Sequence, residues 1–225
     1  FESTLTPEAV SLSAALCSLE MIRGGTTSFL DAGGIHMDEA AKVYIKSGLR
    51  GALTLSTMDD TKVPDSMRAD AAVSISRLNE YYNTWNGSGD GRLSVYYSLR
   101  SLISCSEKLI RGVFEAASER SAMVEAHMNE YPNEINYHLE RYQMRPMEYL
   151  DSLGVLSDHF VSAHSILLSE HEIELMAAKG VKAVHCPFSN CGKGVPNTPR
   201  LLESGISVAF GTDGTAHGGM SLFQE

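Results

Sequence analysis

Strand-like and helix-like stretches alternate along the chain, and this alternation limits the possible folds more than any other feature. Seven short runs rich in β-branched and aromatic residues are separated by stretches whose apolar residues recur at helical spacing. The expected strands cover residues 26–31, 49–56, 92–99, 122–128, 159–165, 181–185 and 206–210. Such alternation predicts parallel strands joined by right-handed crossovers. The pattern therefore favours an α/β fold of the TIM-like (β/α)8 barrel type over an open, doubly wound sheet.

The stretches between these strands predict helices. The expected helices cover residues 8–23, 37–47, 65–85, 106–117, 134–153, 170–179 and 198–204. Pro146 lies inside one of them and requires a new turn or a kink there, because proline lacks the amide that an interior helical position donates. Residues 222–225 predict the start of a further helix.

Composition excludes several classes of function. The chain has 225 residues, 43% of them hydrophobic, which suits a globular domain with a sizeable core. Its net charge of −10 disfavours binding to nucleic acid. No apolar run is long enough to span a membrane, and the four cysteines lack the spacing of a disulfide framework. We therefore expect a cytoplasmic protein with a small-molecule substrate and no membrane or nucleic-acid partner.

Polar residues at the ends of the expected strands indicate where the chemistry lies, because the C-terminal ends of barrel strands meet at one face. These residues are Asp31, Arg100, His127, His164, His185 and Asp213. One histidine at such a position is ordinary, but several histidines converging with an aspartate indicate a metal or catalytic site. Asp213, taken by itself, fits better as the cap of a following helix. Glu130, three residues after His127, is a candidate acid/base group.

The other histidines are expected on the surface, in loops or helices. They are His36, His138, His159 and His171. No G-x-G-x-x-G follows the first strand, so a dinucleotide-binding oxidoreductase is disfavoured.

Five short motifs carry a resemblance to a known family. They are GGTTSFLD at 24–31, HMNE at 127–130, AHS at 163–165, HCPFSN at 185–190 and GTDG at 211–214. In this order and spacing the chain resembles the amidohydrolase superfamily, specifically the branch of methylthioadenosine/S-adenosylhomocysteine deaminases, guanine deaminases and chlorohydrolases. The resemblance covers nearly all 225 residues.

The resemblance implies a metal-dependent hydrolase that deaminates a nitrogen heterocycle of the purine, pyrimidine or triazine type. One zinc or iron(II) would be held by a His-x-His pair on the first barrel strand, by His127 and by Asp213. Asp213 would also take a proton from the attacking water, and Glu130 would protonate the ring nitrogen. His164 would contact the water and the substrate. Dechlorination or hydrolysis of a ring amide would use the same residues.

Three further residues are expected to contact the substrate. Arg100 stands where methylthioadenosine deaminases carry a substrate-binding histidine and guanine deaminases an arginine, which favours an oxo-purine or another carbonyl-bearing ring. His185 either supports the site through a hydrogen bond or acts directly. His217 follows GTDG and is a possible substrate contact.

The sequence departs from the family pattern because it contains no His-x-His. We therefore expect residues 1–225 to form a partial amidohydrolase barrel domain, with strands two to eight, without the first strand and the sandwich domain. Such a chain by itself should be inactive, hold little metal and cover its open sheet edges by forming a homo-oligomer. The competing hypothesis is a non-catalytic barrel-shell protein or an inactive fragment.

Overall fold

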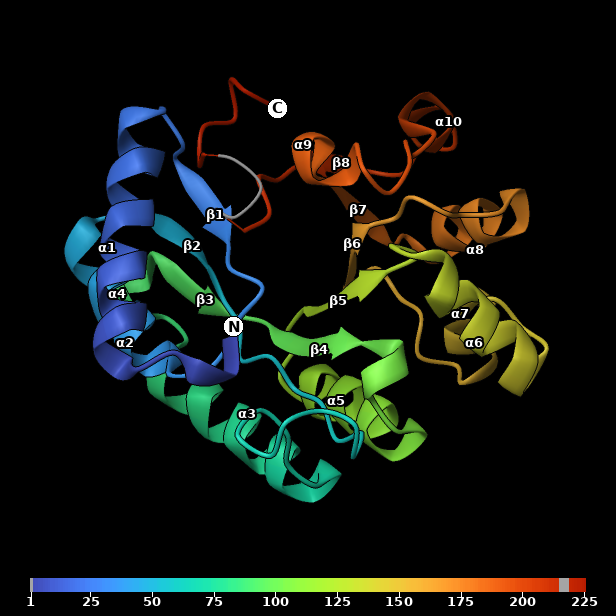
Figure 1. Cartoon of the computed structure of the whole chain (residues 1–225), viewed down its shortest axis with the longest axis horizontal. Helices are drawn as coiled ribbons and strands as arrows, with labels where there is room; N and C mark the ends of the chain where they lie inside the picture. Colours follow the sequence, from blue (N-terminus) through green and yellow to red (C-terminus); the bar gives the residue numbers. More distant parts are fainter. Residues whose placement is uncertain (1, 215–218) are drawn as a thin grey trace.

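The fold is an α/β arrangement of parallel strands surrounded by helices. The computed structural model describes residues 2–214 and 219–225. The strands are β1 (Ser28–Leu30), β2 (Arg50–Leu53), β3 (Leu93–Val95), β4 (Tyr97–Ser101), β5 (Val124–Met128), β6 (Phe160–His164), β7 (Lys182–His185) and β8 (Val208–Phe210). They pair in parallel in the orders β1-β2-β3 and β4-β5-β6-β7-β8. Figure 1 shows them as a curved arc with the helices outside. The predicted incomplete TIM-like barrel is confirmed.

The third expected strand, predicted as one run over residues 92–99, is divided. β3 and β4 are separated at Tyr96, whose amide donates to the Leu53 carbonyl at 2.9 Å. The next amide, that of Tyr97, donates to the Met123 carbonyl at 2.8 Å. The chain therefore changes its hydrogen-bonding neighbour from the β2 side to the β5 side at this point. This stretch joins the two sheets into the arc of Figure 1.

Most of the predicted helices form close to their expected positions. The helices are α1 (Pro7–Arg23), α2 (Met37–Ser47), α3 (Ala71–Trp85), α4 (Ser88–Gly91), α5 (Glu107–Ser118), α6 (Pro132–Tyr142), α7 (Pro146–Ser152), α8 (Glu170–Lys179), α9 (Pro187–Asn190) and α10 (Thr198–Glu203). Two short 3₁₀ turns, η1 (Glu2–Thr4) and η2 (Leu102–Ser104), complete the described elements. The expected break at Pro146 is confirmed: α6 ends at Tyr142, and α7 begins with the proline.

Two helix predictions are wrong in detail. α3 begins at Ala71 and not at residue 65, because Asp70 holds an extended ψ of 149° that cannot continue a helix backwards. Residues 222–224 form a turn in place of the predicted helix, and the Gln224 amide donates to the Ser221 carbonyl at 3.0 Å.

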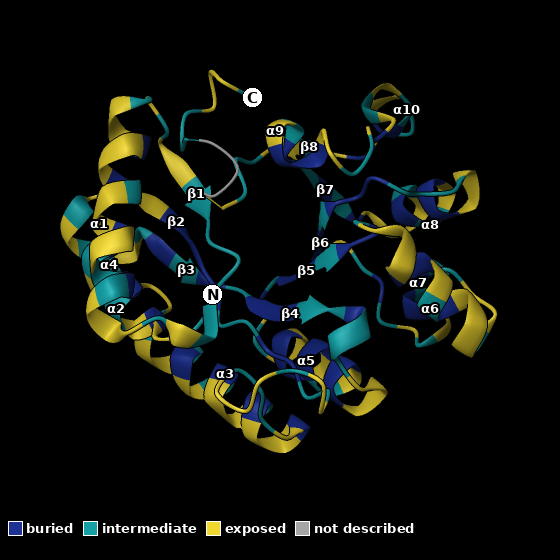
Figure 2. Ribbon diagram, in the orientation of Figure 1, coloured by how far each residue is buried: buried dark blue, intermediate teal, exposed yellow. Residues whose placement is uncertain are grey.

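The core lies between the strands and the surrounding helices. Its larger part packs β4 to β7 against α5, α7 and α8, and includes an edge-on contact between Phe114 and Phe160 with ring centroids 5.4 Å apart. A smaller part packs α1 and α2 against β2 and β3. Figure 2 shows buried residues along β2 to β6 and exposed residues on the outer faces of the helices. Within residues 2–214 and 219–225, no helix is long and apolar enough to cross a membrane.

The prediction that His138 lies on the surface is wrong, whereas His36, His159 and His171 are exposed as expected. His138, on α6, is fully buried. Its Nδ1 is 2.8 Å from the Glu134 carbonyl, one helical turn earlier, and its ring packs 5.6 Å from that of Tyr149. This packing comes from α7, which folds back onto α6 beyond the break at Pro146, and no local pattern around residue 138 signals it.

Candidate active site

The C-terminal ends of the strands surround one cavity of about 410 Å³. Five residues that the sequence singled out line it, and they come from β4, β5, the loop after β5, β6 and the loop after β8. These residues are Arg100, His127, Glu130, His164 and Asp213. They converge because parallel strands in register bring their carboxyl ends to one side of the sheet.

His127 projects into the cavity from the penultimate position of β5. Its side chain is 17% exposed. Burial, with the nearby charges of Arg100 and His164, lowers the pKa of His127 to about 4. The imidazole is therefore neutral at neutral pH, which is the form that binds metals.

A buried carboxyl group lies beside His127. Glu125 precedes it by two residues on β5, and its Oε1 is 3.6 Å from His127 Nδ1. Within residues 2–214 and 219–225 neither atom has a hydrogen-bond partner, although both are buried. A small approach would let Nδ1–H donate to Glu125 and leave Nε2 as the free ligand atom, an arrangement that commonly orients metal-binding histidines.

Glu130, His164 and Asp213 form the tightest cluster in the cavity. One ligand atom from each lies within 4.8 Å of the others. His164 Nε2 is 3.5 Å from Glu130 Oε1. At the end of β6 the backbone is left-handed at His164 and Ser165, with φ of 69° and 52°. Two such residues in succession are costly, and strain of this kind concentrates at functional sites.

An amide side chain sets the tautomer of His164. Asn190 Oδ1 lies 3.0 Å from His164 Nδ1, and Asn190 Nδ2 lies 2.9 Å from His185 Nδ1. Because the amide oxygen accepts and the amide nitrogen donates, His164 Nδ1 carries a proton and the ring presents Nε2 to Glu130. Asn190 did not figure in the sequence prediction, although it closes the HCPFSN motif.

Asp213 follows β8 in a left-handed conformation with φ of 57°. Its Oδ1 accepts from the Gly214 amide at 2.6 Å, and its Oδ2 accepts from the Ser189 hydroxyl. Burial tends to raise the pKa of Asp213, but these two hydrogen bonds and the charges of His164 and Lys193 lower it overall. The carboxylate therefore stays ionised at neutral pH.

Lys193 is the largest omission of the sequence prediction. It lines the cavity from the loop between α9 and α10, and its side chain is only 10% exposed. Nζ donates to Glu130 Oε1 at 2.6 Å and to Ser189 Oγ at 2.9 Å. Burial opposes its charge, but the contact with Glu130 raises the pKa of Lys193 overall. A lone lysine in a glycine-rich loop offers no sequence signal for this position.

Glu172 on α8 fixes the loop that carries Glu130 through a hydrogen bond to Asn129, the preceding residue. This fully buried carboxylate accepts from Asn129 Nδ2 at 2.9 Å and from Arg145 Nε at 2.6 Å. The Asn129 carbonyl in turn accepts from the Leu167 amide at 2.9 Å. Asn129 is left-handed, with φ of 51°, and its contacts fix the direction in which the chain leaves β5 towards Glu130.

The remaining candidates lie further from this cluster. Arg100 lines the cavity, but its Nη1 pairs with Glu2 Oε2 at 3.2 Å. His185 is absent from the cavity lining and lies behind Asn190. The Asp31 carboxylate accepts from the Tyr44 hydroxyl at 2.7 Å and from the Gly33 amide at 2.9 Å, so both oxygens are engaged away from the cavity. His217 lies outside the described residues.

The donor groups fit a single first-row divalent metal. Imidazole nitrogens and carboxylate oxygens are the ligands that zinc and iron(II) accept. His127 contributes a neutral ring, and its centroid lies 5.4 Å from that of His164. The clustered ligand atoms of Glu130, His164 and Asp213, all within 4.8 Å of one another, are consistent with a cation held close to them.

The fold is that of a TIM-like barrel protein. Its cavity, at the C-terminal ends of the strands, is lined by imidazole and carboxylate groups that can bind a metal. Comparison with known proteins identifies the family. The chain belongs to the amidohydrolase family, whose profile matches residues 1–225.

Similar proteins include deaminases of several substrates. The chain is 34% identical over 221 residues to 5-methylthioadenosine/S-adenosylhomocysteine deaminase 2 of Archaeoglobus fulgidus, covering 97% of this chain and 52% of that protein. An adenosine deaminase from Xanthomonas campestris with bound zinc superposes with a TM-score of 0.90 at 28% identity, covering 99% and 50%. A guanine deaminase from C. acetobutylicum, with guanine in its active site, gives 0.89 at 25% identity, covering 99% and 55%. The chain thus spans about half the length of the relatives it matches.

Proposed function

We propose that this protein is a metal-dependent hydrolase that removes an amino group from a nitrogen heterocycle. One observation carries the proposal: His127, Glu130, His164 and Asp213 come from the ends of three strands, β5, β6 and β8, and line the same cavity. The names of the relatives support it, because the three compared proteins are deaminases of methylthioadenosine or S-adenosylhomocysteine, adenosine and guanine.

The metal would be zinc or iron(II), one per site, held by His127 and Asp213 among the described residues. The zinc in the Xanthomonas campestris structure favours zinc. When bound, such a metal makes water a nucleophile at neutral pH. The other chemical steps belong to side chains of the protein.

Three side chains would orient the water and move its protons. His164, held through its Nδ1 by Asn190, presents Nε2 to the attacking water. The Asp213 carboxylate, whose pKa is lowered, takes a proton from that water. Glu130, 3.5 Å from His164, passes the other proton of the water to the ring nitrogen of the substrate and so makes the amine-bearing carbon electrophilic. The proton on Asp213 then passes to the amine, which leaves as ammonia.

The substrate would be a purine, pyrimidine or triazine. Arg100 presents guanidinium donors to the cavity, which suits a ring carbonyl. His185 would act through Asn190, and His217 remains a candidate substrate contact.

Two statements about the protein's surroundings belong to this proposal. A cytoplasmic location is supported by the four cysteines, all of which are free. A homo-oligomer is supported by exposed apolar side chains along α1.

The test uses the full-length gene product. Elemental analysis should find about one zinc or iron per chain, and a screen of purines, pyrimidines and triazines should detect ammonia release from at least one of them. An Asp213→Ala variant serves as the control and should release none. A product that binds no divalent metal and releases no ammonia would overturn the proposal and favour a non-catalytic barrel.

A further inference from the structure

We propose that Lys193 is the internal counter-cation of the Glu130 and Asp213 carboxylates and that its ammonium competes with a metal ion for their negative charge. The inference rests on the proposed metal-dependent function. It assigns to Lys193 the role of a positioning residue that sets the metal affinity of the site.

The geometry points to this role because the ammonium lies where a bound cation would find its negative partners. Lys193 Nζ is 2.6 Å from Glu130 Oε1 and 3.8 Å from Asp213 Oδ2. It also donates to Ser189 Oγ at 2.9 Å, and Ser189 donates to Asp213. One ammonium therefore contacts or approaches both carboxylates of the Glu130–His164–Asp213 cluster.

Electrostatics explains why a cation is needed there. Two carboxylates whose oxygens lie within 4.8 Å of each other, in a partly desolvated cavity, repel unless a positive charge lies between them. Arg100 is not available for this purpose, because its Nη1 pairs with Glu2. Among the described residues, Lys193 is the cationic side chain that pairs with Glu130 and Asp213.

The same electrostatics makes the ammonium and a divalent metal compete. A dication beside His127 and Asp213 would lie within a few ångströms of Nζ, where the interior screens repulsion poorly. The backbone of Lys193 is tied down, since its amide donates to the Asn190 carbonyl at 2.8 Å. The flexible four-carbon stem is therefore the part that moves, and the aromatic ring of Tyr131, 5.2 Å from Nζ, offers a neighbouring cation–π surface.

The experiment compares Lys193→Met with a charge-keeping variant, Lys193→Arg, and with a matched control, Lys182→Met. Lys182 opens β7 at the opposite end of the strand, and its Nζ donates to the carbonyls of Asp158 and Gly180. Two quantities are measured on the full-length gene product: the Kd for Zn²⁺ by competition with a chromogenic chelator, and the Tm with and without zinc.

Lys193→Met should bind Zn²⁺ about tenfold more tightly than wild type, because a competing charge is gone. Its metal-free form should melt about 3 °C or more below wild type, because Glu130 loses its counter-ion. Lys193→Arg and Lys182→Met should both keep the Kd within about twofold of wild type.

A merely structural lysine would lower Tm without tightening zinc binding. An unchanged or weaker Zn²⁺ affinity in Lys193→Met therefore overturns the inference while leaving the proposed function intact. Absence of zinc binding in every variant, wild type included, overturns the proposed function and this inference with it.

Discussion

Glu130 and Asp213 are both carboxylates of the cavity, yet their surroundings differ. Glu130 contacts two side chains that carry exchangeable protons, Lys193 and His164. Asp213 is fixed by the backbone amide of Gly214 and by Ser189. Neighbours that carry protons suit a proton shuttle, and a carboxylate fixed by the backbone suits a ligand that also receives a proton.

This difference predicts separate effects of substitution in the full-length product. Glu130→Gln should keep its metal but lose about 10²- to 10⁴-fold in kcat, because it removes proton transfer and keeps the shape of the side chain. Asp213→Ala should lose both activity and metal. Elemental analysis and steady-state kinetics on the same preparations provide the measurement. Equal loss of metal in the two variants would show that the roles are wrongly divided.

His138 predicts a pH dependence of stability. Burial lowers its pKa in the folded protein, so that below pH about 6.5 the unfolded chain takes up a proton that the folded chain does not. Stability should therefore be unaffected by His138 above this pH and should decline as pH falls below it. The expected slope is at most ~1.4 kcal/mol per pH unit.

The variant that tests this is His138→Asn, which keeps a donor near the Glu134 carbonyl. It should show a smaller decrease in the free energy of unfolding between pH 7.5 and pH 5.5 than wild type, measured by urea unfolding. His171→Asn, at an exposed histidine on α8, serves as the control and should keep the wild-type slope. An unchanged slope in His138→Asn would contradict the assignment.

At the scale of secondary-structure elements, Glu172 connects three segments behind the site. From α8 it accepts hydrogen bonds from the Met147 amide of α7, from Arg145 and from Asn129 in the loop after β5. Its side chain is fully buried and its ion pair with Arg145 is 2.6 Å long. The loop that carries Glu130 therefore depends on an element more than forty residues later in the chain.

Removing this carboxylate should be costly. Glu172→Ala leaves Arg145 and several amide donors without their partner and should lower the free energy of unfolding by about 3–5 kcal/mol. Glu174→Ala, at an exposed position of the same helix, should change it by less than about 0.5 kcal/mol. Chemical denaturation of both variants tests the prediction, and similar small changes in the two would refute it.

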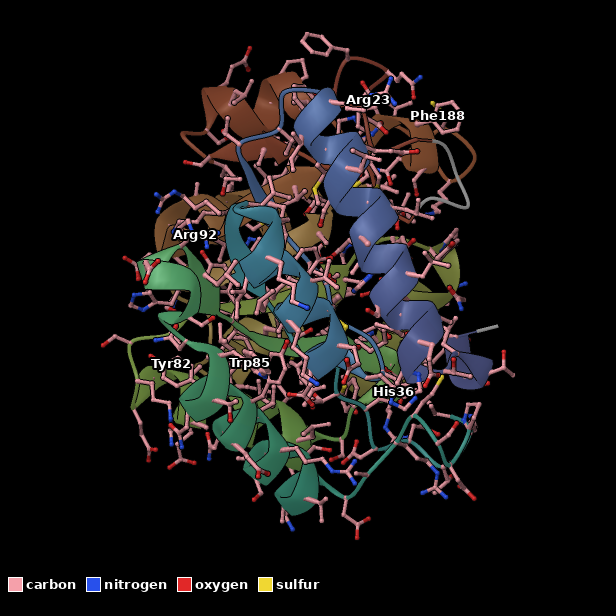
Figure 3. All side chains as sticks on the ribbon, turned by 90° about the vertical axis from the view of Figure 1, so that its left-hand side faces the viewer. Arg23, His36, Tyr82, Trp85, Arg92 and Phe188 are labelled. Carbon is pink, nitrogen blue, oxygen red and sulfur yellow. The ribbon has the colours of Figure 1, made fainter. Side chains whose placement is uncertain are left out.

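At the scale of the whole molecule, α1 presents an apolar stripe to the outside. Leu12, Leu16, Leu19 and Ile22 follow helical spacing and are each at least 50% exposed. Figure 3 looks onto this helix, with Arg23 near one end and His36, at the start of α2, near the other. Contiguous exposed apolar surface of this kind marks a contact site.

The prediction is self-association of the 225-residue chain. Light scattering should give a mass above that of a monomer, 24.5 kDa, and the combined change Leu12→Lys, Leu16→Lys and Leu19→Lys should shift it towards the monomer. Ser13→Lys with Ala15→Lys, at exposed positions of the same helix, adds charge without removing the stripe and should leave the mass unchanged. A monomeric wild-type chain would contradict the prediction.

Much of this fold follows from short-range patterns. The alternation of strand-like and helix-like runs is local, and α2 and α8 begin and end at the predicted residues because their caps, such as Ser169 and Gly180, are adjacent in the chain. The placement of His127, His164 and Asp213 at strand ends is equally local. Their meeting at one cavity then follows from the parallel register of the strands.

Contacts between residues far apart in the sequence determine the features that these local patterns did not predict. The partner of Lys193 lies 63 residues away, so nothing near residue 193 indicates that its ammonium enters an acidic cluster. His138 is buried because α7 packs against it. The strand is divided at Tyr96 because its first part pairs with the β2 side and its second part with the β5 side. Periodicity and capping act over a few residues, whereas burial and charge pairing depend on which distant side chains the folded chain brings within a few ångströms.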